Sequence, residues 1–120
     1  MAQQHIVKAF DEQLNQLDAK IAEMGGLAES MLADAIDALS KRDAELAAEV
    51  VGSDHKLDAL ENDVNNLALR LLALRQPMAE DLRTVLAALK ISSDLERAGD
   101  LAKNIAKRAI TIAKAPPLAT

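Results

Sequence analysis

The chain has 120 residues with a formal net charge of −5, and Ala (24) and Leu (19) supply most of its hydrophobic half. A chain of this length forms one domain with a substantial core. The lack of cysteine excludes a disulfide framework, a thiolate zinc site and a thiol nucleophile. An acidic chain with one aromatic residue is a poor nucleic-acid surface. No apolar run approaches the ~20 residues of a membrane span, and the polar N-terminus is no signal peptide, so we expect a cytoplasmic protein without membrane insertion.

The helix-breaking residues predict three long helices, over residues 4–40, 44–75 and 79–114. Pro77 is the one strong interior breaker, and Asp43 is placed to cap a helix that starts at Ala44. Pro116 and Pro117 end the third helix. We therefore predict a single bundle over residues 1–115 and a Pro-rich tail or linker edge over residues 116–120.

Each predicted helix carries apolar residues at alternating spacings of three and four, with one polar member, Ser53, in the second helix; this is the pattern of a bundle seam. The seam positions are Phe10, Leu14, Leu17, Ile21, Met24, Ala28, Met31, Ala35 and Ala38; Leu46, Val50, Ser53, Leu57, Leu60, Val64, Leu67, Leu71 and Leu74; and Ile91, Leu95, Ala98, Ala102, Ile105, Ala109 and Ile112. The fold class is therefore predicted as all-α, an antiparallel up-down-up three-helix bundle. The first seam runs through Gly25 and Gly26, which we expect to kink or loosen that helix without ending it.

The third helix carries a second stripe that turns from apolar to acidic. Its members, at about 100° per residue, are Leu82, Leu86, Leu89, Ser93, Glu96 and Asp100. Because the seam from Ile91 to Ile112 lies on the opposite side, we predict that this helix changes its buried face midway.

The second helix has a matching acidic group. Asp54 and Asp58 lie four residues apart, and Glu61 follows one turn later. Counting equally from residue 77 in an antiparallel pair sets Asp58 opposite Glu96 and Asp54 opposite Asp100. Four facing carboxylates suit a hard cation or a polynuclear metal cluster.

The same four acids have a simpler interpretation as a solvated face, neutralised by the nearby bases Lys56, Arg97 and Lys103. His55 points about 100° away from Asp54 on a helix and is expected at the surface. Gly99 is expected to serve close helix packing. No constellation of Ser, His and Asp predicts nucleophilic catalysis.

Three segments together resemble the PhoU family over most of the chain, from about Phe10 to Ile112. RQPMAEDLR at residues 75–83 is similar to the signature between that family's second and third helices. DLERAGD at residues 94–100 resembles its Leu-Glu-Arg-x-Gly-Asp segment, and Met24 with the two following glycines matches a feature of its first helix.

The resemblance implies a non-enzymatic bacterial regulator of phosphate uptake. Such proteins restrain the phosphate regulon by acting between a phosphate ABC transporter, through its ATPase, and a membrane-bound sensor histidine kinase. The family's paired acidic motifs bind metal clusters, and here they fall on Asp54, Asp58, Glu96 and Asp100, with Glu61 as a further candidate. The implied metal is iron, manganese, magnesium or zinc.

The family usually has two three-helix units in tandem, whereas this chain has one, either as a natural single-unit relative or as a fragment. An uncovered partner face predicts a homo-oligomer. Two other interpretations stay open: a helical assembly module with a solvated acidic face, and a metal-dependent phosphohydrolase with only Arg97 and Lys103 near the acids.

Overall fold

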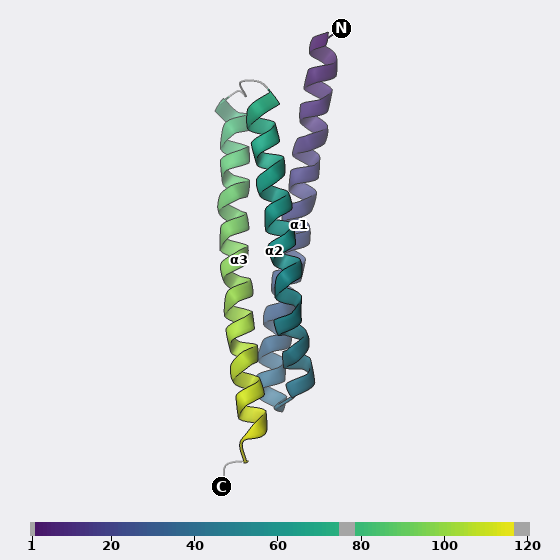
Figure 1. The fold of residues 1–120 in the computed structure, drawn as a ribbon. Coiled ribbons are helices and arrows are strands. Elements are labelled where there is room, and N and C mark those ends of the chain that lie inside the picture. The colour runs from purple at the N-terminus through teal and green to yellow at the C-terminus, as the bar shows by residue number, and fades with distance from the viewer. Residues whose placement is uncertain (1, 75–78, 117–120) are drawn as a thin grey trace.

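The computed structural model describes residues 2–74 and 79–116, with side chains described over residues 10–73 and 81–116. Helices α1 (Ala2–Lys41), α2 (Ala44–Leu74) and α3 (Ala79–Lys114) alternate in direction, running down, up and down in the view of Figure 1, and each packs on both others. The rod measures 74 × 20 × 15 Å. The predicted antiparallel bundle is confirmed, and the helix bounds agree to within two residues, although residue 75 lies outside the described part.

The α1–α2 connection is a two-residue turn with caps on both sides. Arg42 has a positive φ of 56°, and the Asp43 amide donates a hydrogen bond to the Ala38 carbonyl at 2.9 Å, which closes the end of α1. The Leu46 amide then donates to Asp43 Oδ1 at 3.0 Å. The predicted cap of α2 by Asp43 is therefore confirmed.

Arg42 also ties this turn to α3. Its guanidinium donates hydrogen bonds to the carbonyls of Ile112, at 3.0 Å, and Ala115. A helix C-terminus leaves its last carbonyls without helical partners and carries partial negative charge, so a cation is stabilising there. Sequence spacing gave no signal for this contact, because it joins residues 70 positions apart.

The predicted seams of α1 and α2 form the core. Seven of the nine α1 positions are buried, including Met24 and Met31, while Leu14 and Ile21 are half-buried. On α2 the seam is buried or half-buried from Leu46 to Leu71, and Leu74 lies outside the described side chains. α1 stays helical through its two adjacent glycines.

The predicted seam of α3 is wrong in part. Ile91 and Ile112 are exposed, and the buried positions are Val85, Ala88, Ser92, Gly99, Ala102, Ala106 and Ala109. These residues are mostly small, so α3 approaches its neighbours closely and its larger Ile side chains lie at the margins. The buried Ser92 hydroxyl is satisfied by a hydrogen bond to Met24 Sδ at 3.4 Å.

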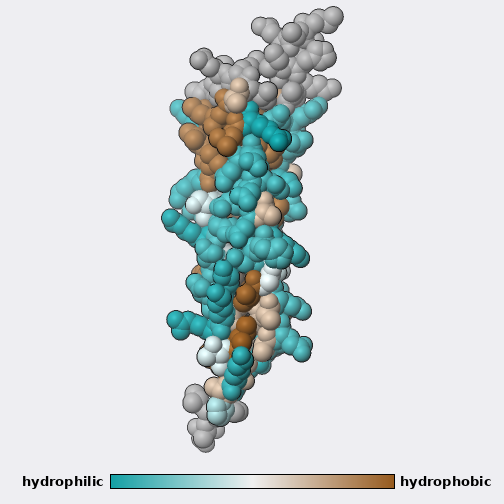
Figure 2. All heavy atoms as spheres, viewed as in Figure 1, coloured by the Kyte–Doolittle hydropathy of each residue, from teal (hydrophilic) through white to brown (hydrophobic). Residues whose placement is uncertain are grey.

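The predicted change of buried face along α3 is also wrong. Leu82 and Leu86 are 38% and 51% exposed, so the second stripe starts on the surface rather than in the core. Leu69 of α2 is exposed as well, and we call these three residues the exposed leucine patch. Figure 2 shows apolar side chains gathered near the end of α2 and the start of α3. Within the described ranges, no helix combines the length and apolar character that a membrane span requires.

Gly99 is a point of close approach between α3 and α2. A Cβ added to Gly99 would overlap Cδ2 of Leu57, and the Leu57 side chain is fully buried. The expected packing role of Gly99 is confirmed. By contrast, a Cβ added to Gly52 would meet no atom within 4 Å.

The two glycines give a matched test of this packing. Gly99→Ala should lower the free energy of unfolding by roughly 1–3 kcal/mol, because the overlap outweighs the better helix propensity of Ala. Gly52→Ala should raise it by up to about 1 kcal/mol. Urea denaturation followed by circular dichroism measures both, and equal effects of the two substitutions would contradict the close approach.

Candidate metal centre

The contact at Gly99 fixes which residues of α2 and α3 lie opposite one another. Leu57 fills the space over Gly99, so the acids flanking each residue along its helix are brought to one height of the bundle. α2 contributes Asp54, Asp58 and Glu61 there, and α3 contributes Glu96 and Asp100. The facing of the two acidic groups that antiparallel counting predicted is thus present.

Three of these acids converge on one point. One carboxylate oxygen each from Asp54, Glu96 and Asp100 lies within 4.8 Å of the others. Carboxylate groups that converge in this way without a cation repel one another. Of the two remaining candidates, Asp58 is exposed and Glu61 is half-buried, and both lie near enough to act on Glu96.

Two oxygens of the group are withdrawn from water without gaining a hydrogen-bond donor. They are Asp54 Oδ1 and Glu96 Oε2, which are buried and lack a hydrogen-bond partner among the described residues. The Asp54 side chain is only 14% exposed. A buried acceptor without a partner costs free energy, and a bound cation would remove that cost, so this donor set fits a metal ion.

Lys103 is the base that forms an ion pair with this acidic group. Its Nζ lies 3.0 Å from Asp54 Oδ2, in a part-buried ion pair. The hydrogen bond and the charge of Asp54 raise the pKa of Lys103, with smaller contributions from Asp100 and Asp58. Of the three bases that the sequence offered, Lys56 and Arg97 are exposed and have no ion pair within the described ranges.

The neighbouring acids and burial shift the pKa of Glu96. Burial, a hydrogen bond with Asp58 and the negative charges of Asp58, Glu61 and Asp100 together raise its pKa from 4.5 to about 8. Burial is the largest of these causes. Near neutral pH the metal-free site therefore holds a proton on Glu96, and this proton would leave when a cation binds.

The five acids are suited to bind a cation rather than to carry out a covalent step. Carboxylate oxygens in this number are ligands of hard cations such as Mg²⁺, Mn²⁺ and iron. His55 is exposed, as the sequence predicted, and lies outside the converging group. Sequence reasoning missed Leu57, whose apolar side chain sets the register; its seam position marked it only as a core residue.

Comparison with known proteins places the chain in a family. The family model described as the PhoU domain matches residues 21–109. The chain is 52% identical over 115 residues to the phosphate-specific transport system accessory protein PhoU homolog of Caulobacter vibrioides, covering 96% of the chain and 50% of that protein.

Similar matches come from other bacteria. The PhoU homolog of Rhizobium meliloti is 49% identical over 94% of the chain and 48% of its own length. That of Aquifex aeolicus is 44% identical over 93% of the chain and 50% of its own length. The chain thus spans about half the length of these curated relatives. By the domain match and these identities, the chain belongs to the PhoU family.

Proposed function

We propose that the chain is a non-enzymatic regulatory unit of phosphate uptake that binds a metal ion or cluster between α2 and α3. The observation that carries the proposal is the convergence of Asp54, Glu96 and Asp100 within a member of the PhoU family. The matched relatives are named as accessory proteins of a phosphate-specific transport system, which supports the role in phosphate uptake.

The proposed ligands are Asp54, Asp58, Glu96 and Asp100, with Glu61 as an outer member. A cation there would offset the repulsion among acids from two helices and join α2 to α3, so it would stabilise the bundle. Iron, manganese, magnesium and zinc are the candidates. The proposed partners are the phosphate ABC transporter, through its ATPase, and the sensor histidine kinase, in the cytoplasm.

Self-association of the three-helix unit is a further part of the proposal. The curated relatives are about twice as long as the segment they share with this chain. The exposed leucine patch is apolar surface that a monomer would leave in water. We therefore propose that the three-helix unit self-associates when it stands alone.

Metal binding can be measured directly on protein purified without a metal-affinity tag. Adding Mn²⁺ or iron should raise the melting temperature, and Asp54→Asn or Asp100→Asn should weaken binding at least about tenfold. Asp94→Asn is the matched control, since Asp94 is an exposed acid of α3 paired with Lys90. No thermal shift and no bound metal by mass spectrometry would leave a solvated acidic face as the better interpretation.

The pKa of Glu96 gives a pH dependence for the metal-free protein. Because its folded value, about 8, exceeds 4.5, the folded state holds more protons between these values, and stability should fall as pH rises through that window. After discounting for solvent screening, we expect a loss of roughly 1 kcal/mol, or about 4 °C in melting temperature, between pH 6 and pH 9.

Glu96→Gln, which keeps the shape of the protonated acid, should remove this pH-dependent loss, whereas Asp94→Asn should retain it. Thermal unfolding in the presence of a chelator measures the three proteins under the same conditions. Parallel pH profiles for the unsubstituted protein and Glu96→Gln would contradict the assignment to Glu96.

The regulatory role is tested in the cell. Deleting the gene should raise expression of phosphate-scavenging genes in phosphate-rich medium, and a plasmid copy should restore repression. Transcript levels with and without the plasmid measure the effect. Unchanged expression after deletion would contradict the regulatory role without bearing on the metal site.

A further inference from the structure

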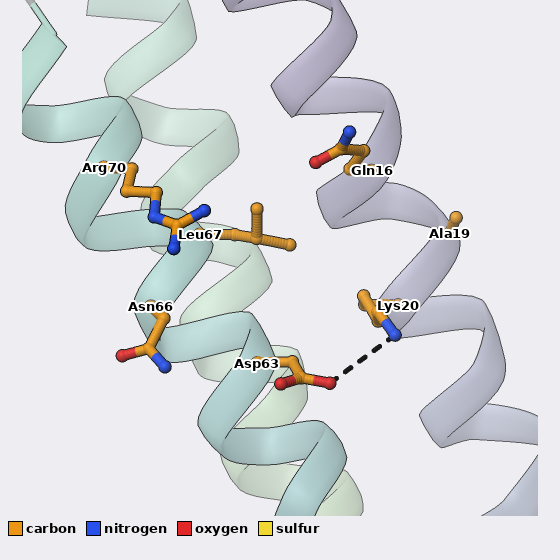
Figure 3. A pocket seen from close by; sticks show the side chains of 7 residues that line it. All are labelled: Gln16, Ala19, Lys20, Asp63, Asn66, Leu67 and Arg70. Atoms are coloured by element: carbon orange, nitrogen blue, oxygen red, sulfur yellow. Dashed lines mark ion pairs between the residues drawn. The ribbon is translucent and has the colours of Figure 1, made fainter.

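The face formed by α1 and α2, away from the acidic cluster, is hollowed along much of its length. An open pocket of about 410 Å³ lies between Gln16 and Lys20 of α1 and Asn66 and Arg70 of α2. Figure 3 shows Leu67 extending from α2 toward α1 in this pocket, with the ion pair between Lys20 and Asp63 crossing it.

Two further pockets continue the hollow toward the α1–α2 turn. One of about 440 Å³ is lined by Glu23, Leu27, Lys56, Ala59 and Leu60. The other, of about 80 Å³, shares Leu27 and reaches Asp34 and Glu49. Together the three form what we call the α1–α2 groove.

The lining residues of each helix follow one stripe, in which Leu27, Leu60 and Leu67 are apolar and the other members are polar or charged. On α1 they are Lys20, Glu23, Leu27, Ser30 and Asp34, at alternating steps of three and four. On α2 they are Leu67, Asp63, Leu60, Lys56, Ser53 and Glu49, at steps of four and three. From Gln16 to Asp34 the groove is about 27 Å long, which matches a helix of about 18 residues.

The groove is apolar in its middle and charged differently at its two ends. Leu27, Ala59 and Leu60 line the middle. Lys20 is already paired with Asp63 at 3.5 Å and with Glu23 at 3.6 Å, so Arg70 is the cation left for a ligand at one end. Asp34 and Glu49 make the other end acidic.

We propose that the α1–α2 groove binds an amphipathic helix of a partner protein. The helix would place apolar residues, spaced by three and four, against Leu27 and Leu60, with an acid near Arg70 and a base near Asp34 and Glu49. The proposal follows from the groove alone and does not rest on the metal site or on the role in phosphate uptake.

A second copy of the chain fits the groove less well. On α3, the exposed Leu82 and Leu86 share a stripe that spans a single helical turn, and the exposed Ile91, Leu101 and Ile112 lie on other sides of the helix. That stripe is much shorter than the groove, and within the described residues it continues through the exposed Ser93 toward the carboxylates of Glu96 and Asp100. A separate partner helix with a longer apolar stripe is therefore the occupant that the groove favours.

The test uses the full chain and a fluorescein-labelled synthetic helical peptide of 20 residues. The peptide carries Leu at spacings of three and four, Glu near one end and Lys near the other. Fluorescence anisotropy should show saturable binding, and a peptide of the same composition with scattered Leu should not bind. Absence of binding by the patterned peptide would overturn the proposal.

Substitutions locate the peptide on the surface. Ala59→Arg should weaken binding at least about tenfold by filling the groove, while Ala87→Arg, at an exposed position of α3, should leave it unchanged. Arg70→Glu should also weaken binding, and a peptide with Lys in place of Glu at that end should restore it.

Two results would assign a different site or occupant and so overturn the proposal. Loss of binding in Leu86→Arg but not in Ala59→Arg would place the peptide on the exposed leucine patch. Sedimentation equilibrium showing a dimer that Ala59→Arg dissociates would make a second copy the occupant of the groove.

Discussion

The packing of Leu57 into the space left by Gly99 is the constraint on which the arrangement of this bundle depends. Two helices can slide along one another by a turn while keeping a generic apolar seam. A glycine whose space is filled by a leucine limits that freedom, because a smaller or larger side chain of α2 placed there would leave a void or an overlap. The register then sets the acids of α2 and α3 at one height.

The acids brought together in this way repel one another, and the protein offsets this repulsion only in part. Lys103 compensates Asp54, and a proton on Glu96 removes one further negative charge. Neither supplies donors to the buried oxygens of Asp54 and Glu96 that lack partners among the described residues. The cluster destabilises the metal-free bundle. Its presence is therefore better explained by a role in binding a cation than by a role in surface solubility.

The sequence was sufficient to predict the helices, the up-down-up order and the facing of the acidic groups, because these follow from periodicity, breakers and equal counting around one turn. It misplaced the core of α3. Apolar size pointed to Ile91 and Ile112, whereas close packing selects small side chains such as Ala102 and Ala106. The contact of Arg42 with α3 and the α1–α2 groove depend on side chains from different helices, which periodicity along one helix does not contain.

The proposed metal site and the proposed docking groove both include residues of α2, so binding at one is expected to affect the other. Asp54 and Asp58 belong to the acidic group shared with α3, while Lys56 and Ala59 line the groove. We expect that a cation drawing α2 toward α3 would also change the spacing between α2 and α1, on which the affinity of a docked helix would depend. By thermodynamic linkage, any effect of the cation on helix affinity equals the effect of the helix on cation affinity. Because α2 belongs to both proposed sites, it is the helix through which metal binding and helix docking would be coupled.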